Sequence, residues 1–193
     1  MKIGICLPTE TEAMNGDTAG GLEILRLARL AEDSGFDSVW VVDHFCYLAA
    51  AEMEALGATA PPDLVGKITG AWECLMLCAA LARETQRVEI GTLVVNTGYR
   101  NPALLARMAE TIDELSAGRF ILGVGAGDFL SEHQAFGYPW ERRVGRFEEA
   151  LQIIRPMLAG ETVTFKGEFY STQDAVNLPR GPRPEGLPLL IGV

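Results

Sequence analysis

Short apolar runs alternate with stretches of helical periodicity along the whole chain. Runs rich in aliphatic and β-branched residues predict buried strands at 2–7, 38–42, 88–95, 119–124 and 187–191. Between them, apolar residues recur at three- and four-residue spacing and predict helices over 21–34, 71–84, about 101–116 and 144–158. Strands that alternate with helices in this way favour an α/β fold, in which a parallel sheet carries its helices outside.

Two stretches interrupt the alternation. Residues 45–69 contain two prolines and two glycines and predict a loop that holds at most a short helix. Residues 163–170, VTFKGEFY, predict a small hairpin with Gly167 in its turn. The pattern allows either a doubly wound sheet or a barrel. A complete (β/α)8 barrel typically needs about 250 residues, so in these 193 residues a barrel would be incomplete, with about five strands.

Charge and composition restrict the partners. The net charge of -10 argues against nucleic acid or an anionic membrane as a partner, and no apolar stretch is long enough to span a bilayer. The opening MKIGICLP is too short and strand-like for a secretory signal. Cys74 and Cys78 lie four residues apart on an apolar helix, which favours buried thiols over metal ligands. We therefore expect a single cytoplasmic domain over 1–193 with no metal.

The carboxyl ends of the predicted strands carry the candidate chemistry, because parallel α/β folds place their active sites there. Asp43 and His44 follow the second strand, and Asn96 follows the third. An imidazole can exchange a proton near neutral pH, and a carboxylate such as Asp43 would favour its charged form if the two side chains meet. A structural histidine that hydrogen-bonds a loop is an equally good interpretation.

A glycine-rich turn, GVGAGD, follows the fourth strand at 123–128. Its glycines would let backbone N–H groups approach an anion or a ring closely. It does not match the dinucleotide-binding fingerprint, because position 128 is aspartate and no helix clearly begins there. Asp128 is therefore either an acid that could protonate a substrate or a solvated or helix-capping residue.

For the other polar residues, the sequence favours structural or surface roles. Glu73 stands near a helix start, where a carboxylate suits the helix dipole. His133 lies in a polar loop and is expected at the surface. The arginines at 142, 143 and 146, interleaved with glutamates, predict a solvated helix face from which one arginine could still reach a phosphate.

Several stretches, taken in order, resemble the bacterial luciferase-like monooxygenase family, which includes FMN-dependent monooxygenases and F420 (deazaflavin)-dependent oxidoreductases. The matching text is WVVDHF (40–45), ALARETQRVEIGTLV (80–94), YRNPALLARMAETIDELSAGRFILGVGAGD (99–128), EHQAFGYPW (132–140) and RFEEALQIIRPML (146–158). The resemblance covers nearly the whole chain. It implies a (β/α)8 barrel with one cofactor at the carboxyl ends of its strands.

The resemblance also implies catalytic residues. His44 matches the position that acts near the reactive ring in the F420-dependent dehydrogenase branch, and Asp43 matches the acid beside it. Asp128 stands where that branch has a glutamate proton donor, so here the acid is kept but is one methylene shorter.

A second set of positions is implied to bind the cofactor. Leu93 and Val94 match a bulge in the third strand, often with a non-proline cis peptide, that supports the tricyclic ring from behind. Gly123 lies where the fourth strand meets the ring, and the Ala126–Gly127 backbone lies near the cofactor tail or phosphate. We count Asn96 with this group.

The resemblance implies F420 or FMN as cofactor, and the choice decides between dehydrogenase or reductase chemistry and oxygen activation. The leading hypothesis is an oxidoreductase acting on a small organic substrate, and the alternative is a flavin-binding protein without turnover. A barrel lyase or hydrolase is disfavoured, because the sequence has neither a metal-ligand cluster nor a GxSxG motif. Family members continue for about three further strands and often form homodimers, so we expect either more residues after 193 or a partner chain over the exposed face.

Overall fold

The computed structural model describes residues 1–55 and 57–192, and its centre is a parallel sheet. The strands β1 (Gly4–Cys6), β2 (Ser38–Val41), β5 (Glu89–Thr92), β7 (Phe120–Gly125) and β10 (Leu189–Ile191) pair in that order, and β6 (Val95–Asn96) also pairs with β7. The spatial order therefore follows the chain order. A doubly wound sheet reverses direction at a switch point, so this order is that of part of a barrel.

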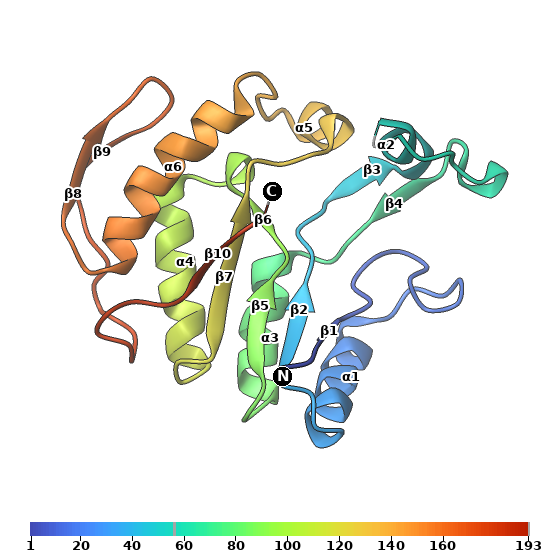
Figure 1. The fold of residues 1–193 in the computed structure, drawn as a ribbon, viewed down its shortest axis with the longest axis horizontal. Coiled ribbons are helices and arrows are strands. Elements are labelled where there is room, and N and C mark those ends of the chain that lie inside the picture. The colour runs from blue at the N-terminus through green and yellow to red at the C-terminus, as the bar shows by residue number, and fades with distance from the viewer. Residues whose placement is uncertain (56, 193) are drawn as a thin grey trace.

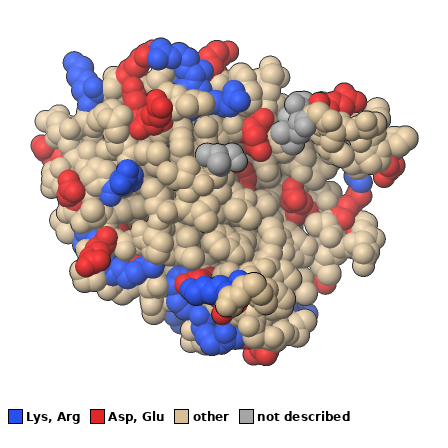
Figure 2. Space-filling view, in the orientation of Figure 1, with Lys and Arg blue, Asp and Glu red and all other residues tan. Residues whose placement is uncertain are grey.

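Three long helices pack against the sheet, α1 (Gly21–Asp33), α3 (Cys74–Glu84) and α4 (Pro102–Leu115), and a fourth, α6 (Arg143–Leu158), packs on α4 at the upper left of Figure 1. Their apolar sides and the strands enclose one core, whose largest fully buried side chains include Phe120, Leu81 and Leu105. Burial of each such side chain contributes about 1.5–3 kcal/mol. The opposite face of the sheet is turned to the viewer, and Figure 2 shows it as mostly uncharged across its middle.

The helix starts agree with the sequence patterns. Asn101 caps α4 by accepting hydrogen bonds from the N–H groups of Ala103 and Leu104, and Pro102 occupies the first helical position. Glu73 caps α3 by accepting from the N–H of Met76, so that helix begins at residue 74 rather than 71. Cys74 and Cys78 are buried, as predicted.

Arg119 fastens the end of the sheet opposite the strand carboxyl ends. Its guanidinium donates to the carbonyls of Ala82, Thr85 and Val88 at 2.7–3.0 Å, and thus satisfies backbone groups where α3 ends. These hydrogen bonds hold β5 and β7 in place at their amino-terminal ends.

The excursion at 45–69 contains more structure than the expected loop. An antiparallel hairpin, β3 (Cys46–Leu48) with β4 (Ile68–Gly70), brackets α2 (Ala49–Ala55) and the short 3-10 helix Pro62–Leu64. The hairpin extends beyond the strand ends and forms a wall at that edge of the sheet (Figure 1).

The predicted hairpin at 163–170 is present but its second strand is displaced. β8 (Val163–Lys166) pairs with β9 (Ser171–Ala175), and Gly167 lies in the turn. The intervening residues cannot pair because the Glu149 carboxylate accepts the backbone N–H groups of 168, 169 and 170.

The expectation that no helix follows the glycine-rich turn is wrong. Helix α5 (Leu130–Phe136) begins two residues after Asp128 and ends at Gly137, which has a left-handed φ of 74°. Within the described part of the chain, no helix combines the length and the apolar character needed to cross a bilayer.

Candidate functional site

A cavity of about 400 Å³ opens at the carboxyl ends of β2, β6 and β7. Its walls include all the predicted site residues but one: Asp43, His44, Leu93, Val94, Asn96, Ala126, Gly127 and Asp128. Sequence reasoning did not assign the remaining lining residues to the site, apart from a general role for the arginines: Tyr99, Gly125, Glu132, Arg143, Val144 and Gly192.

The imidazole ring of His44 has a hydrogen-bond partner at one nitrogen and an aromatic ring stacked on its face. Its Nδ1 lies 3.1 Å from Oε2 of Glu132, and the Phe129 ring stacks on it with centroids 4.6 Å apart. Burial acts to lower the pKa of His44, but the hydrogen bond and charge of Glu132 outweigh it, and the net pKa is raised. The condition set for Asp43, that its side chain meets His44, is not fulfilled, because Glu132 is the carboxylate bonded to the imidazole.

Asp43 is buried and binds elsewhere. Two N–H groups of Arg100 donate to its two oxygens at 2.6 and 2.8 Å, and the backbone N–H of Asn96 donates at 2.9 Å. Burial acts against the charge on Arg100, but its contacts with Asp43 and Glu73 raise its pKa overall. Asp43 thus fixes the backbone where β6 ends. Its own negative charge is balanced by the guanidinium of Arg100.

Leu93 and Val94 form an apolar ridge in the cavity. The peptide bond between them is cis, as the resemblance implies, and it divides the single strand expected at 88–95 into β5 and β6. Leu93 remains 49% exposed, although it is a large apolar residue. Gly125 lies so close that a Cβ there would be 2.9 Å from Cγ2 of Val94.

The glycine turn is packed against Asn96. Gly127 has φ of 83°, and a Cβ there would stand 2.2 Å from Nδ2 of Asn96. That amide also lies 3.0 Å from Nε2 of His133, whose Nδ1 is 3.0 Å from the carbonyl oxygen of Pro139. Because the carbonyl can only accept, Nδ1 carries the proton and Nε2 accepts from Asn96.

The expected surface position of His133 is wrong. The side chain is buried at 1% exposure, because α5 turns it inward onto Asn96. Burial lowers its pKa, so it remains neutral near neutral pH. His133 therefore supports the cavity wall from behind.

Gly123 lies deeper than expected. Its N–H donates to Oγ1 of Thr92 at 2.8 Å, and a Cβ there would be 2.0 Å from the Thr92 carbonyl oxygen. The absence of a side chain is thus explained by close packing of β7 on β5. Among the described residues Gly123 is not part of the cavity wall, whereas Gly125 is.

Two charged side chains stand at the cavity rim. Asp128 is exposed, and the N-cap of α5 is Phe129 rather than Asp128, so the helix-capping interpretation does not hold. Of the three arginines expected on a solvated face, Arg143 lines the cavity, where its guanidinium lies 4.3 Å from the centroid of the Trp140 ring. The other two stack on the ring of Phe169.

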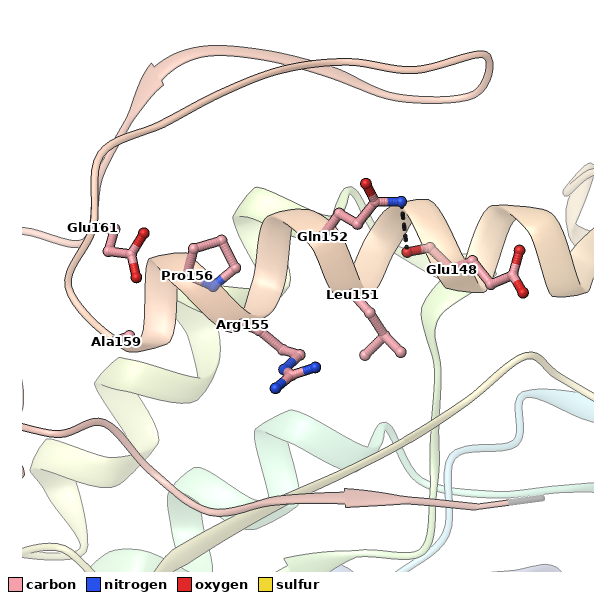
Figure 3. A pocket seen from close by; sticks show the side chains of 7 residues that line it. All are labelled: Glu148, Leu151, Gln152, Arg155, Pro156, Ala159 and Glu161. Carbon is pink, nitrogen blue, oxygen red and sulfur yellow. Dashed lines mark hydrogen bonds between the residues drawn. The ribbon is translucent and has the colours of Figure 1, made fainter.

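A second hollow, of about 540 Å³, lies on α6 and carries no comparable chemistry. Its walls come from one helix and the turn after it, as Figure 3 shows: Glu148, Leu151, Gln152, Arg155, Pro156, Ala159 and Glu161. The side chains project separately, and the amide of Gln152 is bonded to the carbonyl of Glu148 (Figure 3). We therefore place the functional site at the strand ends.

No metal centre accompanies either hollow in the described residues. In residues 1–55 and 57–192, no group of three or more His, Cys, Asp or Glu side chains is placed to hold a metal ion.

Fold and cavity together define a part of a parallel α/β barrel whose carboxyl-end pocket joins an apolar ridge, a glycine turn and a partly exposed histidine bonded to a buried carboxylate. The chain belongs to the luciferase-like monooxygenase family, whose model matches residues 1–193.

Relatives with assigned activities give more detail. The chain is 37% identical over 169 residues to an F420-dependent glucose-6-phosphate dehydrogenase of Amycolatopsis mediterranei, covering 86% of this chain and 46% of that protein. It is 32% identical over 170 residues to a 5,10-methylenetetrahydromethanopterin reductase of Archaeoglobus fulgidus, covering 88% and 43%. The chain thus spans about half the length of these relatives.

Solved structures agree with the fold. An F420-dependent secondary alcohol dehydrogenase in complex with an F420–acetone adduct has a TM-score of 0.74 and 25% identity, covering 99% of this chain and 52% of that one. A monooxygenase from Streptomyces bottropensis has a TM-score of 0.76 and 26% identity, covering 99% and 53%. The expected luciferase-like barrel fold is confirmed, with about half of the barrel in this chain.

Proposed function

We propose that this chain forms the cofactor-facing half of an oxidoreductase that transfers a hydride between F420 and a small organic substrate. FMN is the second candidate cofactor. The observation that carries the proposal is the position of His44: it is fixed by Glu132 in the same cavity as the apolar ridge of Leu93 and Val94.

The residues fit a flat, tricyclic redox cofactor with a phosphorylated tail. Leu93 and Val94 offer an apolar surface against which a ring can lie, and Gly125 beside Val94 and Gly127 beside Asn96 leave the adjoining wall without side chains at these two positions. Arg143 provides a cation for a phosphate. The cavity volume of about 400 Å³ lies within the 300–1,000 Å³ typical of ligand pockets.

Bound F420 would supply hydride chemistry, accepting or giving two electrons with the hydrogen. With F420 as the hydride acceptor, Nε2 of His44 would take the hydroxyl proton of an alcohol substrate as its carbonyl forms. His44 can take that proton because Nδ1 faces Glu132 and Nε2 is left for the substrate. Asp128, exposed at the rim, would exchange protons with solvent.

F420 is preferred over FMN because the F420-dependent glucose-6-phosphate dehydrogenase described above matches 86% of this chain. That relative acts on a sugar phosphate, but the described half of the cavity brings only one arginine and no lysine. We therefore propose a hydroxyl or carbonyl compound as the substrate class and leave a phosphate group out of it.

Binding and turnover test the proposal separately. The purified protein is titrated with F420 and with FMN, and binding is followed by absorbance and fluorescence. His44→Ala should bind the cofactor within a few-fold of the unmodified protein, while single-turnover hydride transfer falls at least about 100-fold, the usual contribution of a general base. His44→Asn is the matched control of similar polarity and should be equally slow.

Two results would overturn the proposal. Failure of the protein to bind either cofactor would remove the oxidoreductase assignment. Undiminished hydride transfer by His44→Ala would remove His44 from the chemistry. Tight binding without turnover on any alcohol or carbonyl compound would instead identify a flavin-binding protein.

A further inference from the structure

Glu132 is a buried carboxylate of the cavity with three different hydrogen-bond partners. Its side chain is 1% exposed, and it accepts from three directions. Tyr99 donates its hydroxyl at 2.8 Å, the backbone N–H of Phe45 donates at 2.6 Å, and Nδ1 of His44 lies 3.1 Å away. All three partners come from other elements than α5, so Glu132 joins this helix to the ends of two strands.

The contact with His44 has a defined direction. An ionised carboxylate can only accept hydrogen bonds, so the proton of a neutral His44 ring must lie on Nδ1. Nε2 then carries the lone pair, and among the described residues no hydrogen-bond partner meets it. Since His44 lines the cavity, its unbonded nitrogen is the one available to a ligand.

Two further contacts prevent the ring from turning over. Phe129 lies on the face of His44 at an interplanar angle of 19°, and Tyr47 packs against it with centroids 5.2 Å apart. The N–H of Phe45 is bonded to the same carboxylate, which fixes the backbone next to His44 as well. Glu132 therefore controls both the side chain and the main chain at this position.

We propose that Glu132 is a positioning residue for His44: it holds the imidazole with its proton on Nδ1 and presents Nε2 to the substrate. The inference rests on the proposed function, because it names the atom that takes the proton in that reaction. Neither the sequence patterns nor the resemblance assigns any role to Glu132.

The charges around His44 support this assignment. Glu132 and Asp128 come from α5 and the turn before it, Glu10 comes from the loop after β1, and Tyr47 of β3 donates to Glu10. Burial acts to lower the pKa of His44, but the three carboxylates raise it, with Glu132 as the largest contributor among them. Removal of the Glu132 charge should therefore lower the pKa of His44.

Nitrogen NMR of the histidine side chains tests the proposal without any cofactor. The sequence contains only two histidines, His44 and His133, so His133→Asn assigns both sets of signals. In the unmodified protein, the ¹⁵N shifts of neutral His44 should report a proton on Nδ1. In Glu132→Gln, the His44 titration midpoint should move to lower pH, and a fraction of the Nε2–H form should appear.

A matched variant separates the contact with His44 from the other bonds of the carboxylate. Tyr99→Phe removes a different donor to Oε2 of Glu132, and it should leave the proton of His44 on Nδ1. His133 lies on the same helix as Glu132, so unchanged signals of the neutral His133 ring in Glu132→Gln show that α5 is intact.

Kinetics complete the test. Glu132→Gln should lower kcat about 10–100-fold, the range found when a partner that orients a metal-ligating histidine is lost, with KM changed far less. The acid limb of the kcat/KM profile should also shift to lower pH.

Two outcomes overturn the proposal: a neutral His44 with its proton on Nε2 in the unmodified protein, or a His44 midpoint in folded Glu132→Gln equal to that of the unmodified protein. The first measurement stands even if the variant does not fold. Failure of F420 and FMN to bind would refute the proposed function alone, because the tautomer is measured without them.

Discussion

Replacement of Arg100 by methionine should destabilise the protein strongly, although Arg100 lies beside the cavity rather than at its centre. Methionine keeps much of the length of the side chain but removes its charge and donors. The arginine side chain is 8% exposed and the carboxylate of Asp43 is 1% exposed, so the ion pair between them is shielded from water.

The expected loss follows from what the substitution leaves behind. Asp43 would lose two hydrogen bonds of 2.6 and 2.8 Å and retain only the N–H of Asn96. Loss of one partner from a buried ion pair costs about 3–5 kcal/mol, because the other charge is left uncompensated. The contact of Arg100 with Glu73 adds little, since Glu73 is 41% exposed.

Chemical denaturation and thermal melting measure this loss. A decrease of 3–5 kcal/mol corresponds to a melting temperature lower by roughly 6–20 °C for a protein of this size. The double variant Asp43→Asn/Arg100→Met should recover at least about 1 kcal/mol relative to Arg100→Met, because the buried charge is gone. A single-variant loss below about 1 kcal/mol, or no recovery in the double variant, would refute the reasoning, since Asp43 would then be able to reach water.

Three further outcomes follow from the structure. Gly127→Ala should weaken F420 binding about ten-fold in a titration, because φ is 83° there and the added Cβ would clash with the side-chain amide of Asn96; unchanged affinity would contradict this. Arg119→Met should lower the free energy of unfolding by about 1–3 kcal/mol with no change in cofactor affinity, since Arg119 bonds backbone carbonyls at the far end of the sheet. Because its pKa is raised in the folded state, His44 should contribute stability below its unfolded pKa of about 6.5 and lose it as pH rises through the folded value, while alcohol oxidation rises over that window; His44→Asn should abolish both trends.

The sequence was sufficient for the parts of the fold that depend on local patterns. Apolar periodicity located the main strands and helices, and the Asn101–Pro102 pair marked the start of α4. It did not reveal the displaced strand β9, because Glu149 of α6 captures three backbone N–H groups from a segment 19–21 residues away. A contact of this kind does not appear in the pattern of apolar and polar residues along the sequence.

The site divides in the same way. Asp43, His44 and Asp128 could be selected because each stands directly after a strand, where parallel folds carry their chemistry. Arg100 and Glu132 could not be selected, since their roles depend on contacts with residues that lie 57 and 88 positions away in the sequence. The burial of His133 could not be predicted, because α5 has too few residues to show helical periodicity. The local sequence signal for this helix is Gly137, which ends it.

The short helix α5 also constrains how this protein can vary. Asp128, Phe129 and Glu132 all act on His44 from one segment, and His133 supports the glycine turn from the same helix. One residue inserted between 129 and 132 would turn the rest of the helix by about 100° and shift it by about 1.5 Å. Glu132 and His133 would both lose their hydrogen-bond partners. A single insertion here should therefore reduce stability and activity more than most substitutions do. We expect the segment 128–133 to keep its length, whereas the connection between β3 and β4 can lengthen or shorten without altering the geometry around His44.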